Sequence, residues 1–108
     1  MANSFKNYFL KNANTTSQNV YVAGAGVSAT VIGMTIGNTT SAPISANITV
    51  TSAGTSYFML QGATVATGGA LVPIGGDQKL VLEAGDYLQV QTSAANSADV
   101  IVSVLEIT

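Results

Sequence analysis

The sequence alternates between apolar and polar residues with a period of two along most of its length. In the segment "APISANITVTS", for example, Ile44, Ala46, Ile48 and Val50 alternate with serine, asparagine and threonine. Successive side chains of a β-strand point to opposite faces, so this pattern predicts strands with one buried and one solvated face. No stretch shows the periodicity of an amphipathic helix.

Further strands are expected in "TVIGMTIGN", "KLVLE", "DYLQVQT" and the C-terminal "DVIVSVLEIT". In the first of these, alternation predicts that Ile32, Met34 and Ile36 share one face and that Val31 lies on the other. The C-terminal segment is apolar on both faces for much of its length. That pattern is typical of a central strand or of a strand covered by a partner.

Turn-forming residues separate these segments. The expected connections are Asn38–Pro43, Ser52–Ser56, Glu83–Asp86 and Ser93–Asp99. Strands that recur about every 8–12 residues indicate an all-β fold, a single antiparallel β-sandwich of about seven to nine strands. Ig-like and jelly-roll-like topologies both fit. Residues 1–12 are expected to form an N-terminal arm or a first strand, and residues 13–108 the sandwich domain.

Charged residues make up only 7% of the chain, whereas about 25% is usual in soluble domains. A surface of neutral polar residues suits a protein that packs against copies of itself or against a partner. The alternative is a low-charge sandwich with no partner. Three lysines and no arginine exclude a basic nucleic-acid-binding surface. No apolar run approaches the about 20 residues of a membrane helix, and the N-terminus has no secretion-signal core.

The chain has no histidine and no cysteine, which excludes Ser-His-Asp and Cys-His catalysis and zinc sites built on these residues. Calcium binding by Asp77, Glu83, Asp86 and Asp99 is a weaker alternative, because their spacing does not match a calcium-binding loop. A glycosidase would need a sugar-stacking platform, and the chain has no tryptophan. We therefore expect no enzyme activity, no catalytic residue, no metal and no cofactor.

Four of the charged residues cluster in "GGDQKLVLEAGD", which spans residues 75–86. Turn chemistry accounts for them: Gly85 gives a permissive turn backbone, and Asp86 can hydrogen-bond the turn. Asp77 is expected to have a similar structural role at the preceding turn. Charges beside a hairpin also discourage edge-to-edge pairing of sheets.

The segments "IGMTIGNTT", "GGDQKLVLEAGD" and "DVIVSVLEI" resemble those of small β-sandwich virion proteins of tailed bacteriophages, especially marine and cyanobacterial phages. The resemblance covers residues from about Ala29 to the C-terminus. It implies a structural role and no catalytic residues. The implied location is the virion, after synthesis in the host cytoplasm.

The resemblance favours a capsid cement or decoration subunit, a homo-oligomer such as a trimer that also contacts other virion proteins such as the major capsid protein. A neck, tail or fibre component, or a receptor-binding sandwich module, is the alternative. Contact residues are predicted from residue type, because aromatic side chains are favoured in interface cores. They are Phe5, Tyr8, Phe9, Tyr21 and Tyr57.

Overall fold

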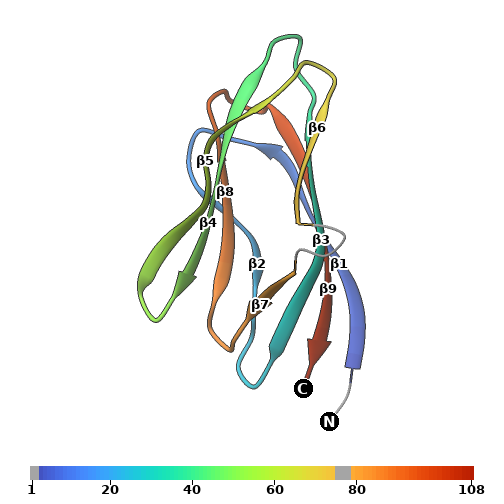
Figure 1. Cartoon of the computed structure of the whole chain (residues 1–108), viewed down its shortest axis with the longest axis vertical. Coiled ribbons are helices and arrows are strands. Elements are labelled where there is room, and N and C mark those ends of the chain that lie inside the picture. The colour runs from blue at the N-terminus through green and yellow to red at the C-terminus, as the bar shows by residue number, and fades with distance from the viewer. Residues whose placement is uncertain (1–2, 75–78) are drawn as a thin grey trace.

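Two antiparallel sheets pack face to face in the computed structural model, which describes residues 3–74 and 79–108 (Figure 1). One sheet has the order β1-β9-β3-β6, and β7 also pairs with β3. The other sheet has the order β2-β8-β4-β5. The strands of the described residues are β1 (Asn3–Ala13), β2 (Gln18–Val22), β3 (Ser28–Asn38), β4 (Ile44–Ser52), β5 (Thr55–Val65), β6 (Ala70–Ile74), β7 (Leu80–Leu82), β8 (Tyr87–Thr92) and β9 (Ala98–Ile107).

The strand pairing is that of a jelly roll. The first strand pairs with the last, β2 pairs with β8, β3 pairs with β6 and β7, and β4 pairs with β5. Strands from the first half of the chain thus pair in reverse order with strands from the second half, and these pairs are distributed over two sheets, as in double-sheet jelly rolls. In an Ig-like sandwich, by contrast, consecutive strands A and B share a sheet. The antiparallel sandwich is confirmed, and of its two expected topologies the jelly roll is the one adopted.

The core lies between the sheets and is built by alternation, which β-bulges interrupt in β3 and between β4 and β5. In β8, Leu88 and Val90 are fully buried while their neighbours are half-exposed. In β9, Val100, Val102 and Val104 are buried in the same way. Full burial of such side chains contributes about 1.5–3 kcal/mol each. The expected placement of the C-terminal segment is confirmed, because β9 lies between β1 and β3.

A β-bulge in β3 changes the expected orientation of Ile32. Val31 pairs with Val104 and Gly33 pairs with Ser103, so Ile32 is an extra residue in the ladder. An extra residue shifts the phase of alternation by one. Val31 is therefore fully buried with Met34, and Ile32 is half-buried. The prediction that Ile32 shares the core face with Met34 is wrong for this reason.

The connection Asn38–Pro43 is held by one buried side chain. The Asn38 amide donates hydrogen bonds to the carbonyls of Ala42 (2.9 Å) and Val65 (3.1 Å). Its oxygen accepts one from the Thr40 backbone N–H (2.8 Å). These bonds join the β3–β4 loop to the end of β5.

The connection Glu83–Asp86 is a tight turn between β7 and β8. The Asp86 backbone N–H donates to the Glu83 carbonyl (2.9 Å), and the Asp86 carboxylate accepts from the Glu83 N–H (3.0 Å). Gly85 has a φ of 89°, a region that favours glycine. Its N–H also donates to the carbonyl of Ala23 (2.8 Å), which joins the turn to the end of β2. Asp77 lies outside the described residues.

The N-terminal segment is a strand at one edge of the five-stranded sheet, not a detached arm. Residues Asn3–Leu10 pair with β9 in one continuous register, and Asn3 lies opposite Ile107. The two ends of the described chain therefore lie side by side (Figure 1). Over residues 3–74 and 79–108, no helix of the length and hydropathy of a membrane span is found.

The turn geometry leads to a stability prediction. Gly85→Ala should lower the free energy of unfolding by about 1 kcal/mol or more, because alanine is strained at positive φ. No atom lies within 4 Å of the added Cβ, so a loss of stability would reflect backbone conformation alone. The measurement is urea unfolding followed by circular dichroism.

Gly24→Ala is the matched control. Gly24 has no positive φ, and an added Cβ would meet only the Val27 side chain at an ordinary 3.8 Å. Alanine should be neutral or slightly stabilising there. Equal effects at the two positions would contradict the turn geometry.

Candidate functional site

The outer face of the five-stranded sheet is rich in exposed apolar side chains. Phe5 lies opposite Leu105, Leu105 opposite Thr30, and Thr30 opposite Val81, so these four form one row across the sheet. A second row pairs Phe9 with Ile101, and the bulge brings Ile32 between the rows. We call the outward side chains of β1, β9, β3 and β7 the apolar face: Phe5, Phe9, Ile32, Val81, Ile101 and Leu105.

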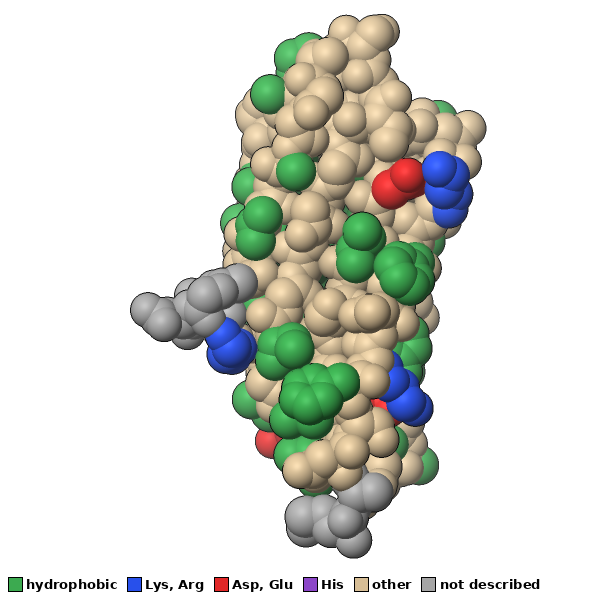
Figure 2. Space-filling model, turned by 90° about the vertical axis from the view of Figure 1, so that its right-hand side faces the viewer, with side chains coloured by type: hydrophobic (Ala, Val, Ile, Leu, Met, Phe, Trp, Pro, Cys, Tyr) green, Lys and Arg blue, Asp and Glu red, His purple; other side chains and the backbone are tan. Residues whose placement is uncertain are grey.

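Three of these side chains are strongly exposed. Phe5 is 75% exposed, Phe9 69% and Val81 64%. Figure 2 shows the side of the molecule that carries β1 and β9, where hydrophobic side chains form separate clusters on a mostly uncharged surface that also carries Lys and acidic side chains. Exposure to water is costly for aromatic rings, and exposed apolar side chains that gather on one face mark interaction sites in soluble proteins.

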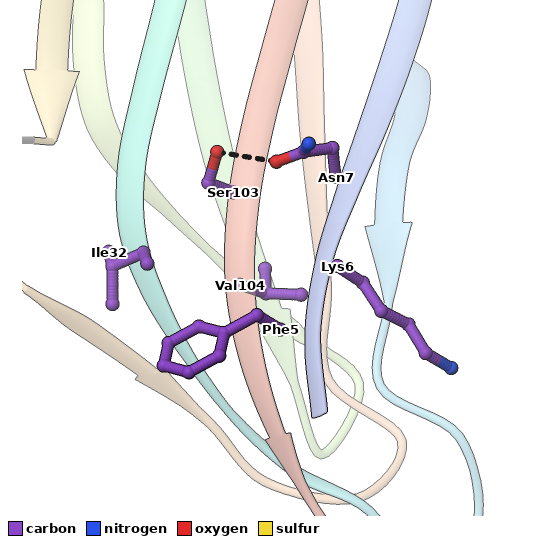
Figure 3. A pocket seen from close by; sticks show the side chains of 6 residues that line it. All are labelled: Phe5, Lys6, Asn7, Ile32, Ser103 and Val104. Carbon is purple, nitrogen blue, oxygen red and sulfur yellow. Dashed lines mark hydrogen bonds between the residues drawn. The ribbon is translucent and has the colours of Figure 1, made fainter. Parts of the chain in front are cut away.

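Two shallow hollows lie on this face beside the two phenylalanines. One, of about 230 Å³, is lined by Phe5, Ile32 and Ser103 among others. Figure 3 shows the Phe5 ring lying across β9 toward Ile32, while Lys6 extends to the opposite side of β1. The other hollow, of about 190 Å³, lies beside Phe9 and Ile101. Both are too open to enclose a small ligand, so they suit projecting side chains of another protein.

Between the two phenylalanines the face is polar but uncharged, and the residues there also line the first hollow. Asn7 lies opposite Ser103, and the Ser103 hydroxyl donates to the Asn7 side-chain oxygen (2.8 Å, Figure 3). At the far end, Lys11 forms an ion pair with Asp99 (3.1 Å). The Asn12 N–H also donates to Asp99 (3.1 Å), and this bond and Lys11 lower the pKa of that carboxyl below its usual range.

A buried carboxylate lies on the inner side of β1 and β9. Glu106 of β9 accepts hydrogen bonds from the hydroxyls of Tyr21 (2.6 Å) and Tyr8 (3.0 Å), and forms an ion pair with Lys6 (3.0 Å). The Tyr21 hydrogen bond and then Lys6 hold the pKa of Glu106 below its usual value. Burial, followed by the Glu106 hydrogen bond, raises the pKa of both tyrosines.

This cluster joins three strands from both sheets. Lys6 and Tyr8 belong to β1, Glu106 to β9, and Tyr21 to β2 of the opposite sheet. The two tyrosine rings also pack together, with centroids 4.7 Å apart. Because β1 is an edge strand, the cluster fixes its position, and with it the two exposed phenylalanines. A charge that points inward at a sheet edge also discourages unwanted pairing.

The outer face of the four-stranded sheet has a different character. Its side chains are amides and hydroxyls that bond to one another: Gln89 donates to Asn19 (2.8 Å), and Asn47 donates to Gln91 (3.4 Å). Exposed aromatic residues occur there at the edge strand β5, namely Tyr57 (58%) and Phe58 (57%). The two outer faces of the sandwich therefore present unlike surfaces.

The predicted contact residues have three different environments. Phe5, Phe9 and Tyr57 are exposed, and Phe5 and Phe9 lie on the apolar face. Tyr8 is half-buried with its hydroxyl on Glu106. The expectation that Tyr21 is an exposed contact residue is wrong: it is 2% exposed, because its hydroxyl is needed by the buried carboxylate.

The prediction from residue type named only aromatic residues and therefore missed the aliphatic side chains of the apolar face. Ile101 and Val81 are exposed and lie in the same rows as the phenylalanines. The signal for Ile101 was present, since the C-terminal segment is apolar on both faces. Nothing in the sequence marked Glu106 as the partner of two tyrosines 85 and 98 residues away.

Within residues 3–74 and 79–108, no group of three or more acidic, histidine or cysteine side chains is placed to hold a metal ion. Of the four acidic residues considered for calcium, Asp99 is engaged by Lys11, and Asp86 by its own turn.

No known protein family matches the chain, and no curated protein matches it. Among solved structures, the chain is similar to the Bacillus endospore appendage protein of disulfide-linked pili, with a TM-score of 0.59 and 17% identity. That match covers 98% of this chain and 88% of the other. A pentameric capsid protein from metagenomic phage sequences gives a TM-score of 0.41 and 19% identity, over 92% of this chain and 59% of the other. The endospore protein shares the fold.

The buried cluster predicts unequal effects for the two tyrosines. Tyr21→Phe should cost about 1.5–3 kcal/mol of unfolding free energy, the usual range for a hydrogen bond to a charged group. Tyr8→Phe should cost less, because Tyr8 is half-buried and water can replace its hydroxyl. Urea unfolding of both variants at neutral pH measures the difference. A larger loss for Tyr8→Phe would contradict the assigned geometry.

Glu106 also predicts a loss of stability in acid. Its pKa in the folded protein is lower than in the unfolded chain, so the folded state favours the ionised form. The contribution is fully present above the unfolded pKa of about 4.3 and is lost as pH falls through the lower folded value. Unfolding free energies measured from neutral pH down to pH of about 3 should decline less in Glu106→Gln than in the parent.

Asp99→Asn is the control for that measurement, because its carboxyl has a lowered pKa of the same sign but lies at the surface. Its effect on the pH profile should be smaller, since exposed ion pairs contribute little. A Glu106→Gln profile parallel to that of the parent would contradict the assigned role of the carboxylate.

Proposed function

We propose that this chain is a non-enzymatic structural subunit of a virion, and specifically a cement or decoration subunit of a phage head. It would be made in the host cytoplasm and act by binding copies of itself and the major capsid protein. The observation that carries the proposal is the apolar face, six exposed or half-exposed apolar side chains on one outer face of a sandwich with very few charges.

The contrast between the two outer faces supports binding rather than a free-standing role. The outward amides of the four-stranded sheet form hydrogen bonds with one another, and its strongly exposed aromatic rings, Tyr57 and Phe58, are confined to the edge strand β5. The five-stranded sheet instead exposes Phe5 and Phe9 together with Val81 and Ile101, which gain free energy when covered. A sandwich without a partner gains nothing from so many exposed apolar side chains on one outer face.

Such a face suits a cementing role energetically. Burial contributes about 25 cal/mol per Å² of apolar area, so a modest contact leaves a few kcal/mol after association costs. One contact of that strength is reversible, but repetition over a symmetric shell multiplies it. The low net charge of −2 means that copies can approach without strong mutual repulsion.

A second candidate is a neck, tail or fibre component. It is favoured by the endospore appendage protein, which has the same fold and forms pili. A fibre subunit would use its exposed surfaces along one axis, whereas a decoration subunit would bind separate positions on a shell. A receptor-binding module is a variant of this candidate, in which the loops Asn38–Pro43 and Ser93–Asp99 would contact the ligand.

Copy number distinguishes these candidates. In purified particles, quantitative mass spectrometry should find one copy per shell subunit, or one per few shell subunits, if the chain is a cement or decoration subunit. The control is a known tail protein measured in the same sample. A few dozen copies per particle would favour the neck or tail, and absence from particles would contradict the virion assignment.

A further inference from the structure

The spacing of the two phenylalanines matches the spacing of the two hollows. Phe5 and Phe9 are four residues apart on one face of β1, which places them about 13 Å apart along the strand. Each has a hollow beside it between β1 and the neighbouring strands. Asn7 and its partner Ser103 lie at the midpoint. The two rings lie at equal distances from this midpoint, each beside a hollow, and the hollow beside Phe5 extends to Asn7 and Ser103. A surface with two rings and two hollows in this order is self-complementary.

We infer that the apolar face is the contact surface for a second copy of this chain, related by a two-fold axis that passes near Asn7 and Ser103. Rotation about that axis places Phe5 of one copy in the hollow beside Phe9 of the other, and Phe9 in the hollow beside Phe5. Each residue then meets the same partner in both copies, as an isologous interface requires. The inference specifies the contact between copies that the proposed function needs.

The charges on β1 and β9 are compatible with this stacking. All four are paired within the chain, Lys6 with Glu106 and Lys11 with Asp99. These strands therefore present no net charge to a second copy, and like charges do not meet across the axis. Nearer the midpoint, Asn7 and Ser103 are hydrogen-bonded to each other and add no charge.

The available area fits a reversible dimer. Four strands spaced about 4.8 Å apart, over eight residues of about 3.3 Å each, outline about 500 Å² of sheet. Projecting side chains raise the accessible area above that outline. Stable interfaces bury about 800 Å² per partner, and weaker ones less than about 600 Å². The dimer is therefore expected to dissociate on dilution through the micromolar range.

Sedimentation equilibrium of the purified full chain tests the inference. The parent should be a concentration-dependent dimer, and Phe5→Asn and Phe9→Asn should each weaken dimerisation at least tenfold. Both side chains are strongly exposed, so the variants should fold, which circular dichroism verifies. Phe58→Asn, on the edge strand of the other sheet and 57% exposed, is the matched control and should dimerise like the parent.

Cross-linking tests the symmetry. The chain has no cysteine, so Asn7→Cys gives a single thiol. A short bis-maleimide should join two copies of this variant efficiently, because the axis brings the two thiols together. Asn19→Cys, an exposed position on the four-stranded sheet, is the control and should cross-link poorly.

Three results would overturn the inference: a parent that stays monomeric up to millimolar concentration, an odd-numbered oligomer such as a trimer, or equal cross-linking from Asn7 and Asn19. None of these results depends on whether the chain occurs in particles. They would contradict the dimer, whereas absence from purified particles would contradict the virion assignment.

Discussion

A two-sheet sandwich can bury only one face of each sheet, and β9 is apolar on both faces. Its inward valines pack against the other sheet, while Ile101 and Leu105 point outward beside the phenylalanines of β1. Within the monomer nothing from the opposite sheet can cover this second row, because the core already occupies the inner side. The apolar face follows from this constraint, and so does the proposal that another molecule covers it. An outer face with amides and hydroxyls, such as that of the four-stranded sheet, imposes no such requirement.

The buried Glu106 carboxylate shows how an edge strand can be positioned without a large hydrophobic contribution of its own. Strand β1 exposes most of its side chains, so apolar burial alone would hold it weakly. The carboxylate binds β1 through Lys6 and Tyr8 and reaches the opposite sheet through Tyr21. Burying a charge is costly unless it is paired and hydrogen-bonded, and here three donors meet that requirement. Glu106 therefore both completes the hydrogen bonds of the core and holds in position the strand that carries Phe5 and Phe9.

Alternation and turn chemistry were enough to predict an antiparallel sandwich, because each depends on residues close together in the sequence. The β7–β8 turn and the buried row of β8 are examples. In β4 the prediction holds for Ile44, Ala46 and Ile48, but beyond a bulge Thr51 is buried and Val50 is half-buried. Ile32 was misassigned because an adjacent Val and Ile give the same pattern with or without a bulge, and only the partner strand decides. Tyr21 was misassigned because residue type does not reveal a hydrogen-bond partner 85 positions away. The jelly roll itself is defined by pairings between distant strands, which a local pattern does not contain.

The jelly roll pairs the first described strand with the last, and this has a consequence for the order of events in the cell. During synthesis β9 emerges after all the other described strands, so β1 cannot find its partner until then. The rows that combine Phe5 with Leu105 and Phe9 with Ile101 do not exist in a shorter nascent chain. A nascent chain that ends before β9 therefore lacks the apolar face. Exposed phenylalanines and their neighbours come together on one surface only after β9 has been translated and has paired with β1.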